Sequence, residues 1–488
     1  MLFNSIEYLF FLPIVFLIYW AIGYSRFNDS LRRRMQNIFL LLASYVFYAR
    51  WDWRFLGLLF GMSFLSWGCG SLIDKCNSRS PLTINRSPLP KILLWLSVAV
   101  SIGILGVFKY YNFFVFSFAD LFGLQNTIHS LKIVLPLGIS FFTFQAISYV
   151  VDVYKRKIEP TNIVDCLLYI GFFPKLLAGP IERPTNLIPQ IQKNRVFEYE
   201  LAVDGCRQML WGLFKKVVIA DNCALYVNQV YGDYANQSGS TLLLAAILYT
   251  IQIYGDFSGY SDMAIGSAKL LGFRFRDNFL FPYFSRNMNE FWRRWHISLN
   301  TWFVDYVYIP LGGSRNGKWH TIRNIMIVFL LSGLWHGADW SFVAWGAYHG
   351  LLLVLLILLN RNTKYEHVVA YDRWYPSFRE LGQMLLVFVL ATFGWMMFRA
   401  DNMTQFMDYT RSMCSMSIFS MPMIAVGLKK TLFFIALMFG IEWFERKETH
   451  GFALSRFPRW ARIVAVYVLI LCILEFIGNS QSFIYFNF

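Results

Sequence analysis

Residues 6–22 read IEYLFFLPIVFLIYWAI, an apolar run in which Glu7 is the only charged side chain. An α-helix rises 1.5 Å per residue, so about 20 apolar residues cross the hydrocarbon core of a bilayer. No basic stretch precedes the run, and no cleavage site of small residues follows it, so we do not expect a removable signal peptide. The run therefore predicts a first transmembrane helix.

The composition of the whole chain agrees with a bilayer environment. Of 488 residues, 57% are hydrophobic and 15% are charged, against about 25% charged in soluble proteins. The net charge is +15. In membrane proteins an excess of Lys and Arg is typical of the cytoplasmic loops, so we expect no nucleic-acid partner. The seven Cys show no paired or metal-ligand spacing, which argues against a disulfide framework or a zinc site.

Further apolar runs separated by polar breaks predict about eleven to twelve transmembrane helices in one domain, residues 1–488. Several runs are shorter than about 17 residues, so some are expected to be tilted, re-entrant or interfacial. Residues 164–190 predict a broken segment, because Pro174, Pro180 and Pro184 interrupt a helix. The fold class is thus an all-α polytopic membrane protein, with further runs at 36–49, 53–73, 91–118, 132–150, 210–230, 241–256, 324–338, 340–359, 381–398, 428–443 and 463–478.

Lysine and arginine alternate between the loops of this arrangement. The basic loops should lie in the cytoplasm and the loops without Lys or Arg outside, which places both termini outside. The basic loops are 24–35, 74–91 and 151–160; the loops without Lys or Arg are 119–130, 231–240 and the tail 479–488.

The longest polar segment, residues 273–323, reads FRFRDNFLFPYFSRNMNEFWRRWHISLNTWFVDYVYIPLGGSRNGKWHTIR. Its arginines predict a cytoplasmic position, and 287–303 is amphipathic enough to lie on or dip into the interface. One interpretation is an interfacial helix whose cations hold anionic lipid headgroups. The other is a cationic, aromatic-lined mouth for a phosphate-bearing donor such as a coenzyme A thioester, with Arg293, Arg294 and Arg315 as phosphate ligands.

Two histidines are candidates for chemistry. His296 lies in the polar segment between Trp295 and Ile297, and His336 lies forty residues later at the end of an apolar run. Ionisable residues within membrane spans are costly and are functional candidates. A neutral imidazole accepts a proton from a hydroxyl. The alternative is a helix-packing glycine pair, Gly333 and Gly337, with a structural histidine between them.

Motifs of soluble enzymes are missing from the sequence. It contains no Walker loop, G-x-S-x-G elbow or HExxH. The stretch GDFSGYSDMAIG (255–266) lacks the elbow spacing, and a broken, cavity-lining turn explains it equally well.

Several blocks nevertheless resemble the membrane-bound O-acyltransferase family, in particular its bacterial alginate O-acetylation branch. They extend from the first residue to the last: MLFNSIEYLFFLPIVFLIYW, FFPKLLAGPIERP, DFSGYSDMAIG, EFWRRWHISLNTWFVDYVYIPLGGSR, LWHGADWSFVAWGAYHG and FIYFNF. The resemblance implies helices around a central funnel or tunnel. It also implies that His336 is the principal catalytic residue, and that His296 is the second motif residue, which is Asn in many eukaryotic members.

The implied reaction moves an acyl group, acetyl above all, from a cytoplasmic thioester to hydroxyls of an extracytoplasmic polysaccharide. Acetyl-CoA is expected as substrate, with no bound cofactor and no metal. An extracytoplasmic Ser-hydrolase-like acetyltransferase is the expected partner, in the inner membrane of a bacterium. His336 would act as general base, and His296 would either orient the donor or polarise the thioester carbonyl. The remaining donor-binding or tunnel-lining candidates are Trp295, Asp305, Gly333, Trp335, Gly337 and His349.

Other functions stay open at this point. A D-alanyl transferase taking its donor from a carrier protein would use the same family architecture. A polysaccharide or lipid translocator would also need a cavity and broken helices, but no histidine in a glycine-flanked turn. A structural subunit of an export complex would not need the cavity. Transfer from acetyl-CoA, and its loss in His336→Ala, separates these classes.

The terminal residues FIYFNF (483–488) carry no charged side chain and are too apolar to extend into water. They predict either an aromatic anchor at the membrane interface or a segment folded into the protein. In the second case the phenol of Tyr485 is a candidate acyl acceptor, because a reactive aryl ester passes its acyl group on readily.

Overall fold

The computed structural model describes residues 1–78, 88–123, 131, 133–479 and 481–484. The described chain is helical and contains no β-strand. It divides into two compact units: Met1–Cys206 with Ala264–Arg276, and Arg207–Met263 with Asp277–Phe488. Parts of the loops used to predict orientation, 79–87 and 124–130, lie outside the described residues.

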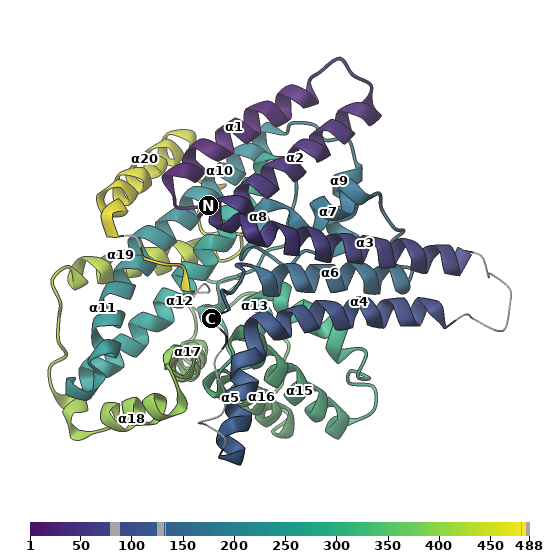
Figure 1. Cartoon of the computed structure of the whole chain (residues 1–488). Coiled ribbons are helices and arrows are strands. Elements are labelled where there is room, and N and C mark those ends of the chain that lie inside the picture. The colour runs from purple at the N-terminus through teal and green to yellow at the C-terminus, as the bar shows by residue number, and fades with distance from the viewer. Residues whose placement is uncertain (79–87, 124–130, 132, 480, 485–488) are drawn as a thin grey trace. The chain divides into compact units, whose positions relative to one another are not determined.

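The first unit is built around long apolar helices. Helices α3, α4 and α6 pack against one another, as do α1 with α2 and α2 with α7 (Figure 1). The predicted broken segment is observed as short α7, α8 and α9. The helices are α1 (Ile6–Gly23), α2 (Asp29–Asp52), α3 (Leu56–Ser78), α4 (Leu89–Leu105), α5 (Tyr111–Phe122), α6 (Ile139–Tyr154), α7 (Ile163–Gly171), α8 (Phe173–Leu176) and α9 (Pro184–Gln192).

The second unit contains the two candidate histidines, His296 and His336. Its most extensive helix pair is α15 with α16, and α16 also packs on α17. Helices α10 (Tyr199–Phe214) and α12 (Gly239–Leu270) belong partly to each unit. The others are α11 (Asp221–Gly232), α13 (Met288–Arg294), α14 (Ile297–Phe303), α15 (Lys318–His336), α16 (Trp340–Leu358), α17 (Phe378–Arg399), α18 (Met403–Met413), α19 (Leu428–Phe444) and α20 (Arg459–Phe476).

Six helical stretches of the described chain are long and apolar enough to cross a membrane. Apolar side chains are exposed on α1, one of these six, which presents Leu9, Phe10 and Leu17, and on α20, outside the six, which presents Val464 and Leu471. Apolar stripes of this length would not be stable in water, whereas they suit a lipid environment. The prediction of an all-α polytopic membrane protein is confirmed.

Two expectations about local structure were wrong. The stretch 255–266 is no broken turn, because α12 continues through it as one helix from Gly239 to Leu270. The predicted amphipathic helix 287–303 is split at His296 into α13 and α14, and most of its large side chains are buried in the second unit. Residues of 255–266 therefore pack along a helix, and most of 287–303 is part of the protein core.

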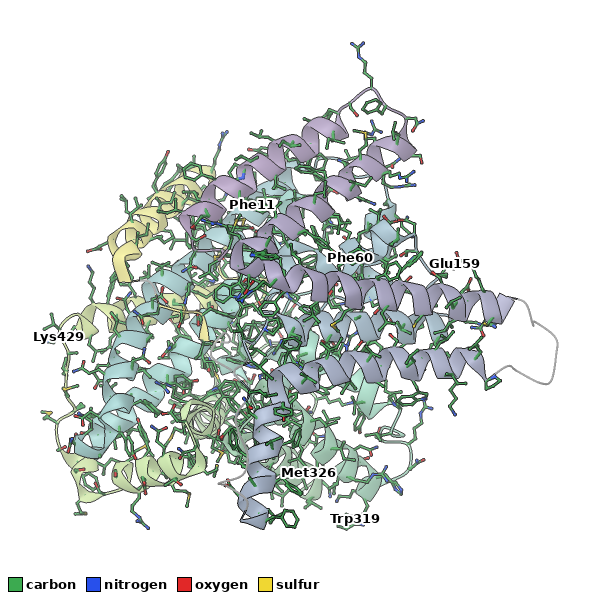
Figure 2. All side chains as sticks on the ribbon, in the orientation of Figure 1. Phe11, Phe60, Glu159, Trp319, Met326 and Lys429 are labelled. Carbon is green, nitrogen blue, oxygen red and sulfur yellow. The ribbon has the colours of Figure 1, made fainter. Side chains whose placement is uncertain are left out.

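Close backbone contact explains why α15 and α16 pack so tightly. A Cβ atom on either Gly333 or Gly346 would lie 3.3 Å from the Cα of the other, and it would collide with a backbone carbonyl. Farther along the pair, Met326 lies against Gly350. Figure 2 labels Met326 on α15 and Trp319 near its start, where Trp319 is exposed. An exposed Trp beside basic residues is typical of a membrane interface.

Candidate active site

The two candidate histidines meet in the second unit. The imidazole centroids of His296 and His336 lie 6.3 Å apart, and the side chains are buried. His336 is the last residue of α15, and His296 precedes the first residue of α14. The Trp335 indole lies 6.0 Å from His296 and 4.9 Å from His336. The fold therefore places two buried imidazoles beside a shared aromatic wall.

The backbone of His296 is unusual, with φ 44° and ψ 52°. This left-handed conformation costs an L-residue about 1–2 kcal/mol and is kept where surrounding structure enforces it. Asn278 supplies that structure. Its carbonyl accepts a hydrogen bond from the Ile297 N–H (3.0 Å), and its side-chain oxygen accepts one from the Ser298 hydroxyl (2.9 Å). The Asn278 amide in turn donates to Ser261 on α12 (2.9 Å).

The surroundings of His296 are apolar. The Phe257 ring meets its imidazole edge to face, with centroids 4.6 Å apart at 87°. Burial lowers the pKa of His296 to about 3, because a charged imidazolium loses its hydration there. His296 is therefore neutral at physiological pH, and one ring nitrogen carries a proton while the other accepts.

His336 is enclosed by aromatic side chains of α16 and α17. Its ring centroid lies 5.0 Å from that of Trp345 and 5.2 Å from that of Phe398. The neighbouring Gly337 leaves room for the Phe342 ring, which a Cβ atom would overlap. These walls exclude water from the imidazole, which strengthens electrostatic interactions with a reacting group.

The other predicted site residues lie in different surroundings. His349 lies 5.1 Å from Trp345, which separates it from His336, and a Cβ on Gly394 would overlap it. Trp295 packs against Trp395, with ring centroids 4.7 Å apart. Gly333 serves the contact between α15 and α16, as the packing alternative supposed. Asp305 is half-buried in the π-helical turn Val304–Tyr308, and Tyr485 lies outside the described residues.

The three predicted donor arginines differ in their surroundings. Arg294 binds Glu290 (3.0 Å) and the Leu280 carbonyl (3.1 Å). The same Glu290 also binds Arg286, so Arg294 belongs to a structural network. Arg293 and Arg315 are exposed. Of the three, Arg293 and Arg315 alone have guanidinium groups on the surface, where an incoming phosphate would meet them.

An ionic cluster that the sequence motifs did not indicate joins α12 to the turn Lys215–Ala220 and the start of α11. Lys216 pairs with Asp256 at 2.7 Å and with Asp221 at 2.8 Å, and all three side chains are buried. A second pair joins Lys215 to Asp262 at 2.6 Å. The sequence carried a signal for this cluster, because Lys215, Lys216, Asp221 and Asp256 stand in the apolar runs 210–230 and 241–256, where ionisable groups are expected to pair.

Comparisons with known proteins identify the family of this chain. Residues 3–369 match the model of MBOAT, the membrane-bound O-acyltransferase family. A probable alginate O-acetylase AlgI of Pseudomonas putida is 40% identical over 408 residues, covering 83% of this chain and 78% of that protein. A peptidoglycan O-acetyltransferase of Helicobacter pylori is 31% identical over 445 residues, covering 86% and 80%. A teichoic acid D-alanyltransferase of Bacillus subtilis is 29% identical over 286 residues, covering 54% and 68%.

The chain belongs to the membrane-bound O-acyltransferase family. It is a multi-pass membrane protein and an acyltransferase, as the sequence blocks predicted. Its relatives at 37–40% identity include several probable alginate O-acetylases.

Proposed function

We propose that this acyltransferase moves acetyl groups from acetyl-CoA, bound on the cytoplasmic side of the bacterial inner membrane, toward hydroxyls of an extracytoplasmic polysaccharide. The observation that carries the proposal is the buried pair of His296 and His336, 6.3 Å apart, within one aromatic-walled site. The names of the relatives supply the acetyl group and the polymer class, since they are called alginate O-acetylase and peptidoglycan O-acetyltransferase.

In the proposed reaction His336 is the general base. It accepts the proton of the attacking hydroxyl while the hydroxyl oxygen forms a bond to the thioester carbonyl carbon. The carbon–sulfur bond breaks, and the proton passes to the departing thiolate. His296, neutral and held rigidly by Asn278, donates a hydrogen bond to the carbonyl oxygen as negative charge develops on it. The exposed Arg293 and Arg315 bind the phosphates of the donor.

The contacts between loops of the second unit support the predicted alternation of the loops. Segments expected inside meet one another: Asn287 donates to the Thr363 carbonyl (3.1 Å), and Trp443 donates to that of Trp374 (2.9 Å). The alternation places 399–427, between the runs 381–398 and 428–443, on the same side as 231–240, and these segments meet, as the Gly239 N–H donates to the Ser417 hydroxyl (2.8 Å). The basic loops then assign this side, with both termini, to the outside, where we propose an extracytoplasmic Ser-hydrolase-like partner.

The test uses purified protein in lipid nanodiscs with radiolabelled acetyl-CoA. We expect consumption of the thioester, and a fall of about 10²–10⁴-fold in His336→Ala, the usual contribution of a general base. His320→Ala is the matched control, because His320 lies on the same helix and is exposed. Activity of His336→Ala within threefold of the parent would contradict the assignment. Consumption of a D-alanyl carrier protein instead of acetyl-CoA would favour the D-alanyl alternative.

A further inference from the structure

A cavity of about 350 Å³ lies within the second unit, apart from the two histidines. Pockets that hold small ligands have volumes of about 300–1,000 Å³. Its walls come from α11, α12, α16, the end of α17 and the C-terminal segment, defined here as residues 481–484. Neither imidazole lines it.

The lining contains buried polar groups that lack partners. Tyr249 and Gln252, one turn apart on α12, are 0% and 8% exposed. Within the described chain, neither the Tyr249 hydroxyl nor the Gln252 side-chain oxygen has a hydrogen-bond partner. Buried polar atoms are satisfied in the great majority of cases, so two such groups beside one cavity indicate a ligand rich in hydrogen-bonding groups.

The charges around the cavity are balanced. Arg399 lies 3.8 Å from Asp401 and donates to the Asn228 side chain at 3.2 Å. The two opposite charges cancel, and the remaining polar lining consists of amides and hydroxyls, including those of Gln252 and Ser482. Such a lining selects a ligand through hydrogen bonds to hydroxyl groups more than through net charge.

One wall of the cavity leads toward His336. The Phe342 ring lines the cavity and lies 4.9 Å from the Phe398 ring, which lies 5.2 Å from the His336 imidazole. Two aromatic rings therefore separate the cavity from the proposed base. A displacement of these rings would connect the two spaces.

Another wall of the cavity is formed by the C-terminal segment. Lys216 donates to the Gln481 carbonyl at 3.1 Å, and the Ile484 N–H donates to Asp256 at 2.7 Å. The segments around this cavity include the two, 399–427 and 479–488, that the proposed topology places outside. On the proposed topology the cavity therefore faces the outside, whereas the arginine-rich segment 273–323 faces the cytoplasm.

We propose that this cavity binds the acyl acceptor, and that the acceptor is a carbohydrate whose hydroxyl groups bond to Gln252 and Tyr249. The inference rests on the proposed function, since it assigns the second substrate of the same reaction. The apolar face of the Phe342 ring packs on the sugar C–H groups, and one hydroxyl reaches His336 when the ring moves aside. The relatives' names point to the same chemistry, because alginate and peptidoglycan carry sugar hydroxyls.

The test measures acetyl transfer from acetyl-CoA to short mannuronate and peptidoglycan-glycan oligosaccharides by the protein in nanodiscs. We expect at least one to be acetylated with saturation kinetics. Loss of one buried hydrogen-bonding partner, in Gln252→Leu or Tyr249→Phe, should raise the acceptor KM about tenfold and leave the donor KM within twofold. Gln192→Leu, at an exposed glutamine, is the matched control.

Two results would overturn the assignment while leaving the acetyltransferase function standing. One is an unchanged acceptor KM in both variants. The other is thioester consumption with acetyl appearing only on a protein serine and on no oligosaccharide. Absence of acetyl-CoA consumption by the parent protein would instead count against the proposed function. Tyr249→Phe removes a single oxygen atom, so it keeps the test informative if Gln252→Leu fails to fold.

Discussion

The Ile484 N–H donates a hydrogen bond of 2.7 Å to the Asp256 carboxylate, joining the C-terminal segment to the middle of α12. Asp256 also pairs with Lys216, whose ammonium donates to the Gln481 carbonyl. Between these two anchors the Phe483 ring stacks on Tyr260 at 4.6 Å. The segment is therefore fixed to the helix that also carries Phe257, the ring in contact with His296.

The anchor predicts a specific effect of Asp256→Ala. Removing one partner of a buried ion pair leaves the other charge uncompensated, at a cost of about 3–5 kcal/mol. We expect the Ile484 amide to lose its protection in hydrogen exchange and acetyl transfer to fall at least tenfold. Asp233→Ala is the control, because Asp233 lies on an exposed turn. Retained protection of Ile484 would show that Asp256 does not hold the segment.

His296 predicts a difference between two substitutions. Because its pKa is lowered to about 3 by burial, the side chain is neutral from pH 5 to pH 8. A neutral amide replaces its hydrogen bond, so His296→Asn should retain more activity than His296→Ala, by about tenfold. The pH profile of kcat/KM in His296→Asn should match that of the parent. A lost titration step in the Asn variant would mean that His296 ionises in the working range.

Asn278 allows an independent check on His296. Asn278→Ala removes the acceptor for Ser298 and leaves the histidine in place. If rigidity of the left-handed His296 matters, kcat should fall with little change in the donor KM. A larger donor KM at unchanged kcat would place Asn278 in donor binding instead.

The sequence predicted the membrane fold well because the signal for a span is local. Residues 6–22 correspond to α1 (Ile6–Gly23), and the run 340–359 corresponds to α16 (Trp340–Leu358). The stretch 255–266 was misread because its glycines and polar residues resemble a turn. In the structure its two aspartates pair with Lys215 and Lys216 and remain helical. Pairing across distant segments is a tertiary property that no local pattern contains.

Part of the site was likewise beyond prediction from sequence. The motif blocks indicated His296 and His336, and the structure brings them together. Nothing in the sequence indicated Asn278. Its backbone carbonyl and its side-chain oxygen accept hydrogen bonds from Ile297 and Ser298, which lie nineteen and twenty positions along the chain. The cavity beside Gln252 depends on residues 481–484 folding back onto α12, a contact that sequence spacing does not reveal.

The arginines predict separate kinetic effects. Arg293→Gln and Arg315→Gln should each raise the donor KM and make that KM less dependent on salt concentration. Exposed cations attract phosphate through an electrostatic interaction that salt screens. Arg294→Gln should lower thermal stability instead, since it breaks the contact with buried Glu290. Thermal shift and initial rates on the three proteins distinguish these roles. A raised donor KM in Arg294→Gln at unchanged stability would contradict this division.

Topology is open to test through a native thiol. Cys414 is exposed and lies in the segment 399–427 that we place outside. A membrane-impermeant maleimide should therefore label it in cells whose cytoplasmic membrane is intact, and Cys414→Ser should remove that label. Labelling only after the membrane is permeabilised would reverse the proposed orientation.

The last prediction concerns Tyr485, which lies outside the described residues but follows Ile484 directly in the chain. Since the preceding residue is anchored to Asp256 and lines the cavity, we propose that the Tyr485 phenol receives the acetyl group first, and that the carbohydrate hydroxyl in the cavity then takes it from the tyrosyl ester as the phenolate leaves. His336 removes the phenol proton, the phenolate oxygen attacks the thioester carbonyl, and the proton leaves with the thiolate. An aryl ester is a reactive ester, because phenolate with a pKa of about 10 is a good leaving group.

Tyr485→Phe removes only the nucleophilic oxygen and keeps the ring. If Tyr485 carries the acetyl group, the variant should lose polymer acetylation while its amount in the membrane stays unchanged. Intact-mass measurement of the parent protein with acetyl-CoA should show one added acetyl group, absent from Tyr485→Phe and from His336→Ala. Tyr467→Phe, at an exposed tyrosine of α20, is the control. Normal polymer acetylation by Tyr485→Phe would mean that the acetyl group passes to the acceptor without a tyrosyl ester, and that the tail serves as an anchor alone.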